Sequence, residues 1–264
     1  MNSASKKAIL VVSFGTSYEN TRKLTIEAIE HDIADAFPAC PTYRAWTSKM
    51  IIAKLKKRDG LTIHTVKEAL EQMLLDGITD VIVQPTHVIN GIENDQMKAD
   101  ALSFRDRFSS IVFGNPLLTT EEDNQAIVRV VADEFRDMDP DTALVLMGHG
   151  TEHYANTVYA ALDYRFKDTG HKNIFLGTVE AYPALDSLLR AADSFHPKKI
   201  VLAPFMIVAG DHAQNDLAGA DSDSWNRLSS EGYEVTPVLK GLGEYPQVRQ
   251  ILVEHVQQAM NASV

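Results

Sequence analysis

The fold is decided by the apolar run Ala8-Ile9-Leu10-Val11-Val12, which leads directly into Phe14-Gly15-Thr16-Ser17. The same pattern returns as Ala143-Leu144-Val145-Leu146-Met147, which leads into His149-Gly150-Thr151-Glu152. A short apolar run that ends at a glycine-containing turn is typical of a buried strand followed by a loop. The chain therefore contains one strand–loop pattern that occurs twice.

A second pair of segments supports this internal repeat. The run 81–85 leads through Gly91 to Glu93, and the run 200–204 leads through Gly210 to His212. The offset between copies is 135 residues for Gly15 and Gly150 and 119 for Gly91 and Gly210, a net difference of 16. This alignment places His149 opposite Phe14 and His212 opposite Glu93. Two similar lobes with such an asymmetric cluster predict a site in the cleft between them.

Short β-rich runs alternate with amphipathic segments along the whole chain, which is typical of parallel α/β folds. We expect two similar doubly wound parallel-sheet lobes, 1–125 and 126–264, whose ligands bind beyond the carboxyl ends of the strands. The sequence leaves open whether the last helix packs on the first lobe. Strands are predicted at 8–13, 42–46, 79–84, 110–113, 142–147, 173–179, 198–203 and 233–238. Helices are predicted at 19–36, 48–58, 65–76, 93–108, 120–137, 153–168, 184–194, 213–230 and 245–261.

The composition restricts the class of protein. A chain of 264 residues with 45% hydrophobic residues has room for two cores. It contains no apolar stretch of about 20 residues that would span a membrane, and we expect no membrane partner. Its formal net charge of -11 disfavours a nucleic-acid partner. The single cysteine, Cys40, fits a reducing compartment. With no secretory leader pattern before residue 8, we expect a cytoplasmic protein.

Three potential metal ligands follow predicted strands of the second lobe. They are His149 between two glycines, Glu180 after the run 175–179, and His212 after the run 200–204. Two imidazoles and one carboxylate suit a borderline divalent ion such as Co²⁺, Fe²⁺, Ni²⁺ or Zn²⁺. Three protein ligands leave coordination positions for a substrate. A lone histidine in an apolar context is more often structural, but three such residues at successive strand ends favour a metal site.

Other motifs in the sequence point to different functions. His149 to His153 matches the H-x-x-E-H spacing of inverted zinc peptidases, which requires both histidines on one helix. Here His149 follows a strand and lies between glycines, so that context is missing. The sequence contains no G-x-G-x-x-G, no P-loop and no G-x-S-x-G motif. We therefore expect no nucleotide cofactor and no serine nucleophile.

Segment 49–58 places five cations in ten residues of an acidic chain: Lys49, Lys54, Lys56, Lys57 and Arg58. One interpretation is a solvated helix face. The alternative is a local positive rim for substrate carboxylates, to which the neighbouring Arg44, Thr47 and Ser48 would contribute. Charge patterning alone does not decide between the two.

Several motifs resemble the anaerobic cobalt chelatases of the CbiK type, from about residue 7 to about residue 261. The similarity covers nearly the whole chain in both motifs and spacing. It is carried by 11–17, 147–150, 179–183 and 208–216, and further by 58–60, 87–91, 223–225 and 241–244.

The resemblance implies a class II chelatase that inserts Co²⁺ into sirohydrochlorin or its reduced precursor precorrin-2, without ATP, in anaerobic cobalamin biosynthesis. It implies His149, Glu180 and His212 as metal ligands, with Glu93 facing them. We expect His149, Glu93 and Glu180 to act in catalysis. Ser13, Phe14, Lys49 and Arg58 are expected to contact the tetrapyrrole, with Phe14 pressing on the macrocycle.

Metallation removes two pyrrole protons while a divalent cation enters the ring. We expect His149 or a neighbouring carboxylate to accept one proton and Glu93 to accept or relay the other. Two alternatives stay open: the same reaction with Fe²⁺ or Ni²⁺, and a non-catalytic tetrapyrrole or metal carrier. The sequence also leaves the oligomeric state open, a homo-oligomer included.

Overall fold

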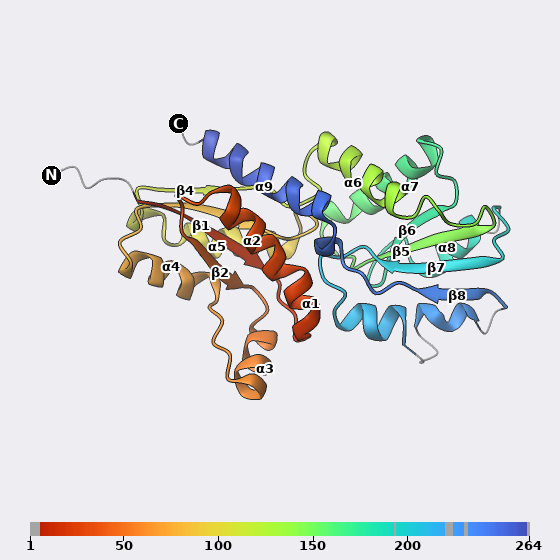
Figure 1. The fold of residues 1–264 in the computed structure, drawn as a ribbon, viewed down its shortest axis with the longest axis horizontal. Helices are drawn as coiled ribbons and strands as arrows, with labels where there is room; N and C mark the ends of the chain where they lie inside the picture. Colours follow the sequence, from red (N-terminus) through yellow and green to blue (C-terminus); the bar gives the residue numbers. More distant parts are fainter. Residues whose placement is uncertain (1–5, 193, 220–223, 230–231, 263–264) are drawn as a thin grey trace. The chain divides into compact units, whose positions relative to one another are not determined.

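The computed structural model describes residues 6–192, 194–219, 224–229 and 232–262 (Figure 1). The chain divides into two compact units, one formed by Met1–Thr119 with Pro246–Val264 and the other by Thr120–Tyr245. The first boundary thus lies slightly before the expected one after residue 125. The C-terminal helix, whose position the sequence left open, belongs to the first unit.

Unit 1 contains a four-stranded parallel sheet in the order β2-β1-β3-β4. The central strand β1 is buried on both faces, which explains its unbroken apolar sequence. Ala8, Leu10 and Val12 form one core with residues of α4 and α5, and the alternation of strand side chains places Ile9 and Val11 on the other face. The strands are β1 Lys7–Ser13, β2 Thr42–Trp46, β3 Asp80–Pro85 and β4 Ser110–Phe113. The helices are α1 Glu19–Leu24, α2 Ile26–Ala36, α3 Lys49–Asp59, α4 Val66–Leu75, α5 Ile92–Leu102 and α9 Pro246–Asn261.

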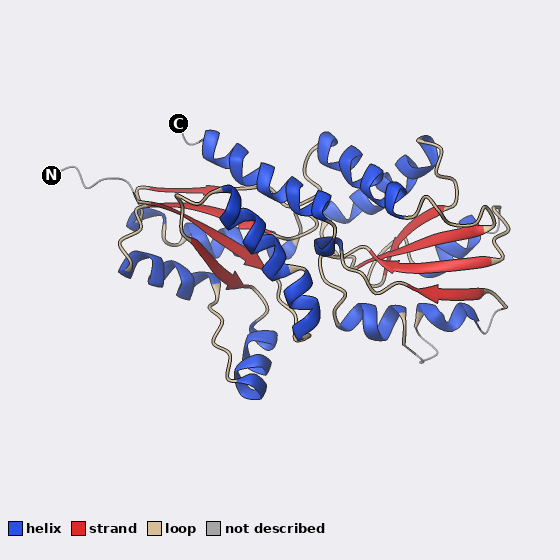
Figure 2. Cartoon of the chain, viewed as in Figure 1, coloured by secondary structure: helices blue, strands red, loops and turns tan. Residues whose placement is uncertain are grey.

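Unit 2 repeats this topology with the order β6-β5-β7-β8, again parallel throughout. Figure 2 shows helices flanking each sheet. Ala143, Val145 and Met147 of β5 share a core with α8. Burial of the valine and the methionine contributes about 1.5–3 kcal/mol each. The strands are β5 Thr142–Gly148, β6 Ile174–Thr178, β7 Lys199–Pro204 and β8 Glu234–Pro237. The helices are α6 Glu121–Glu134, α7 Thr157–Asp168 and α8 Leu185–Ala192. The structure confirms the expected α/β fold with two parallel sheets.

The repeat extends to individual backbone hydrogen bonds. The N–H of Ser48 donates to the carbonyl of Phe14, as the N–H of Glu180 donates to that of His149. The N–H of Leu117 donates to the carbonyl of His87, as that of Leu242 donates to Met206. The loops at the carboxyl ends of the two sheets are therefore built alike, although their side chains differ.

The last helix of each repeat belongs to the unit that contains the sheet of the other repeat. Helix α6 follows β4 of the first repeat but belongs to unit 2, where it packs on α7. Helix α9 follows β8 of the second repeat but belongs to unit 1, where it packs on α2, β3 and β4. The chain thus exchanges its terminal helices between the two halves.

Several predicted helices are shorter than expected. The segment 19–36 breaks at Thr25, whose φ of −121° and ψ of −79° leave the helical region. Residues 93–108 form α5 and a short 3₁₀ turn, and residues 153–156 precede α7 rather than extending it. Within 213–230, described residues form a π-helix at Ala213–Leu217 and a 3₁₀ helix at Trp225–Ser229, while 220–223 and 230 lie outside the described residues.

Among the residues that the structure describes, none of the helices combines the length and apolar character that crossing a bilayer requires.

Candidate metal centre

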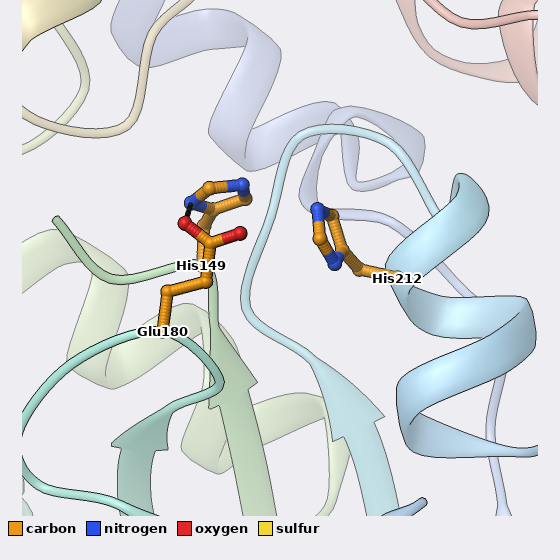
Figure 3. Close-up of side chains that lie close together, drawn as sticks. All are labelled: His149, Glu180 and His212. Carbon is orange, nitrogen blue, oxygen red and sulfur yellow. Dashed lines mark ion pairs between the residues drawn. The ribbon is translucent and has the colours of Figure 1, made fainter. Parts of the chain in front are cut away.

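His149, Glu180 and His212 come together at the carboxyl edge of the unit 2 sheet. They follow the adjacent strands β5, β6 and β7, and parallel strands end at the same edge. One ligand atom from each residue lies within 4.8 Å of the others. His149 and Glu180 lie side by side, and the ring of His212 faces them from the segment after β7 (Figure 3). No other group of three or more such ligands was found within the described residues.

Close approach of two loops positions His149 and Glu180. The N–H of Glu180 donates to the carbonyl of His149 at 2.9 Å, and His149 Nδ1 lies 3.5 Å from Glu180 Oε2. Gly150 lies where the two loops touch and has a φ of +88°. A Cβ at this position would lie 2.8 Å from Thr178 Cβ and 2.9 Å from the backbone nitrogen of Ala181. A side chain at position 150 would therefore both strain the backbone and separate the two loops.

A side chain outside the cluster also connects these loops. The amide oxygen of Asn156 accepts from the N–H of Thr151 at 3.1 Å, and its amide nitrogen donates to the carbonyl of Tyr182 at 2.6 Å. One asparagine thus links the loop of His149 to the loop of Glu180.

The segment that carries His212 is held by the loop after β8. The N–H groups of Leu242 and Gly243 donate to the carbonyls of Met206 and Ile207 at 2.7 and 3.0 Å. A Cβ at Gly241 would lie 2.5 Å from the carbonyl oxygen of Ile207, so the two loops need glycine there to touch. His212 then precedes the π-helix, a rare wide turn that occurs frequently at functional sites.

The hydrogen bonds of both rings indicate which nitrogen is available to bind a metal. His149 Nδ1 lies 2.8 Å from the carbonyl oxygen of Gly150, and His212 Nδ1 lies 2.5 Å from Asp216 Oδ2. A carbonyl and an ionised carboxylate only accept hydrogen bonds, so we infer that each Nδ1 carries the proton. Both rings then present the lone pair of Nε2. Their centroids are 4.6 Å apart, with the ring planes at 87°.

The three candidate ligands remain accessible from outside unit 2. The side chains of His149 and Glu180 are 44% and 52% exposed, and that of His212 is 35% exposed. A site with three nitrogen and oxygen ligands, an orienting carboxylate and open coordination positions fits a borderline divalent ion that has to be handed on.

Unit 1 places two predicted site residues at the carboxyl edge of its own sheet. Phe14 follows β1 and is 43% exposed, and Glu93 is exposed in the first turn of α5. Glu93 holds the repeat position of His212, eight residues after the end of β3 as His212 is after β7.

The other predicted tetrapyrrole contacts have different surroundings. The hydroxyl of Ser13 is buried and accepts a hydrogen bond from Thr86 Oγ1 at 2.9 Å, because both faces of β1 are covered. Lys49 is exposed at the start of α3. Arg58 donates to Asp59 and, at 2.8 Å, to the carbonyl of Ser17, so its guanidinium already has partners.

The structure does not place His149 and His153 as an inverted zinc peptidase motif requires. His149 lies in the loop after β5, and His153 precedes a 3₁₀ turn, where its Nδ1 accepts from the N–H of Ala155 at 3.2 Å. The two histidines do not share a helix.

Sequence reasoning assigned no role to Asp216 or Asn156. The i, i+4 spacing of His212 and Asp216 was an available signal, because residues four apart meet on a helix. Asn156 had no comparable signal, since its two partners lie in separate loops.

Comparison with known proteins identifies the family of this chain. A sequence model of the family described as "Cobalt chelatase (CbiK)" matches residues 7–261. The chain belongs to this family. It is 39% identical over 260 residues to the sirohydrochlorin cobaltochelatase of Salmonella typhimurium, covering 98% of both chains. It is 32% identical over 265 residues to sirohydrochlorin cobaltochelatase CbiKC of Nitratidesulfovibrio vulgaris, covering 97% of this chain and 92% of that one.

The fold of this cobalt chelatase family member also resembles a solved chelatase. The sirohydrochlorin chelatase SirB from Bacillus subtilis subspecies spizizenii, solved in complex with cobalt, superposes with a TM-score of 0.69. The match covers 98% of this chain and 97% of SirB at 14% sequence identity. At that identity the similarity supports the chelatase fold.

Proposed function

We propose that this chain inserts Co²⁺ into sirohydrochlorin, without ATP, in cobalamin biosynthesis. The observation that carries the proposal is the cluster of His149, Glu180 and His212, whose ligand atoms lie within 4.8 Å of one another. Membership of the cobalt chelatase family supports cobalt as the substrate metal, and the two curated relatives are both named for this reaction.

In the proposed mechanism, His149, Glu180 and His212 hold Co²⁺ and release it to the macrocycle. Each metal that enters displaces two pyrrole protons. His149 or a neighbouring carboxylate accepts one proton as the metal leaves, and Glu93 accepts or relays the other. Phe14 is exposed enough to press on the macrocycle, and Lys49 to bind a substrate carboxylate. We leave Ser13 out because its hydroxyl is buried, and Arg58 because its guanidinium is occupied within unit 1.

Fe²⁺ and Ni²⁺ are the alternative metals, because imidazole and carboxylate ligands suit all three ions. A non-catalytic carrier of tetrapyrrole or metal is the alternative class. For location we propose the cytoplasm, since the single cysteine, Cys40, fits a reducing compartment.

The test is anaerobic metallation of sirohydrochlorin with Co²⁺, Fe²⁺ or Ni²⁺ in parallel, followed by visible spectroscopy. Faster metallation than in the protein-free control supports a chelatase, and the three rates rank the metals. A spectral shift on binding without acceleration for any metal would support the carrier instead. His153→Asn is the matched control variant because it removes a nearby imidazole and keeps a capping side chain.

A further inference from the structure

Helix α3 is an insertion that only the first repeat contains. Ser48 and Glu180 are equivalent by their backbone hydrogen bonds and lie 132 positions apart. Val66 and Leu185, which begin α4 and α8, lie 119 positions apart, and both are buried on their sheets. The first repeat therefore has 13 additional residues between these points, and they include α3. This insertion accounts for most of the net difference of 16 between the copies.

The insertion is strongly cationic and exposed. Met50, Lys54 and Lys57 follow one face of α3 with i, i+4, i+7 spacing, while Ile51 and Leu55 are buried on the other. No ion pair joins Lys49, Lys54 or Lys57 to any residue in the described part of the chain. Three uncompensated lysines on one short helix contrast with a chain whose net charge is -11.

Both ends of α3 are fixed to the loop that follows β1. At its start, the N–H of Ser48 donates to the carbonyl of Phe14 at 3.2 Å. At its end, Arg58 donates to the carbonyl of Ser17 at 2.8 Å. Figure 1 shows α3 standing off from the body of unit 1, beyond the end of β2. The lysines therefore lie at the edge of unit 1 that also carries Phe14.

We propose that α3 recognises the acid side chains of the tetrapyrrole and selects macrocycles by their number of carboxylates. This inference rests on the proposed function, in which the substrate is a polycarboxylate of the sirohydrochlorin type. Lysine suits the role because its ammonium is a point charge on a flexible stem that follows carboxylates on a mobile side chain. A local positive patch also offsets the repulsion between an acidic protein and an anionic substrate.

The test is equilibrium binding of metal-free porphyrins, measured by fluorescence, to the whole chain at low ionic strength. The probes are uroporphyrin, an octacarboxylate; coproporphyrin, a tetracarboxylate; and protoporphyrin, a dicarboxylate. The test variant carries Lys54→Glu and Lys57→Glu, and a second variant carries Lys54→Arg and Lys57→Arg. The matched control carries Arg129→Glu and Lys172→Glu, which makes the same charge change at exposed positions of unit 2.

We expect the native chain to bind uroporphyrin more tightly than protoporphyrin, and the glutamate variant to bind uroporphyrin about tenfold more weakly. Protoporphyrin affinity should stay unchanged in that variant, and the arginine variant and the control should keep the native order. An equal loss in the control, or no dependence on carboxylate number in the native chain, would overturn the inference. The binding test contains no metal, so it measures carboxylate selection independently of metallation. A failure of this inference is therefore distinguishable from a failure of the proposed function.

Discussion

His212 Nδ1 lies 2.5 Å from Asp216 Oδ2, four residues further along the same chain segment. The carboxylate fixes the ring orientation and leaves Nε2 for the metal, an arrangement common around metal-binding histidines. Asp216 is therefore a positioning residue for the proposed cobalt site, although it is not one of the three ligands.

The first prediction concerns this carboxylate. Asp216→Ala should weaken Co²⁺ binding by about 10–100-fold, because the ring of His212 loses its orienting partner. Isothermal titration with Co²⁺ under anaerobic conditions measures the change. Glu152→Ala removes an exposed carboxylate three residues after His149 and should leave the Kd unchanged. Equal Kd values for Asp216→Ala and the native chain would refute the positioning role.

The second prediction compares two glycines with positive φ. Gly150→Ala and Gly170→Ala each place an alanine in the left-handed region, at φ of +88° and +98°, which costs about 1–2 kcal/mol of stability. Only the Cβ at position 150 meets neighbouring atoms, among them the backbone of the loop that carries Glu180. Gly150→Ala should therefore also weaken Co²⁺ binding, whereas Gly170→Ala should not.

Thermal unfolding and Co²⁺ titration of both variants check this prediction. If Gly150→Ala kept native Co²⁺ affinity, close approach of the two loops would not matter for the site.

The third prediction concerns Glu93 in unit 1. Glu93→Gln should slow metallation of sirohydrochlorin while Co²⁺ affinity stays near native, because the residue is proposed to handle a proton rather than to bind the metal. Stopped-flow spectroscopy gives the rate, and titration gives the affinity. Lost Co²⁺ binding would make Glu93 a ligand instead, and an unchanged rate would remove it from the mechanism.

The fourth prediction is a pH dependence of stability. Burial lowers the pKa of His87 from 6.5 to about 4, opposed by the side chain of Asn94. The folded chain therefore favours neutral His87, and its contribution is complete above pH 6.5 and is lost as the pH falls toward 4. As the pH falls from 6.5 to 4, the cost of protonating the buried ring of His87 should lower the free energy of unfolding by roughly 3 kcal/mol.

His87→Met places at this position the residue that the second repeat has there, Met206. Urea unfolding at a series of pH values should show a smaller loss of stability in acid for the variant than for the native chain. Parallel curves for the two proteins would contradict the assignment of this acid sensitivity to His87.

The sequence predicted that the three candidate ligands lie together, because parallel strands fix where their carboxyl ends lie. Once β5, β6 and β7 were recognised as neighbours, His149, Glu180 and His212 had to meet at one edge. The internal repeat was also visible in the sequence, because each copy has to bury equivalent apolar strands.

The remaining features depend on contacts between loops. Asn156 reaches two loops at once, and the orientation of Ser13 depends on helices covering both faces of β1. The exchange of α6 and α9 is likewise decided by tertiary packing, because both helices are ordinary amphipathic segments. The sequence showed that the two repeats differ in length by a net 16 residues. Locating most of this difference at α3 required the backbone hydrogen bonds of Ser48 and Glu180.

The most direct test of the proposed cobalt site is the Co²⁺ affinity of the native chain, His149→Ala, His212→Ala and His153→Asn, with the metallation rate of each. We expect one Co²⁺ site in the native chain and in His153→Asn, with both affinity and rate lost in the two alanine variants. Native-like Co²⁺ binding and rate in His149→Ala and His212→Ala would contradict it.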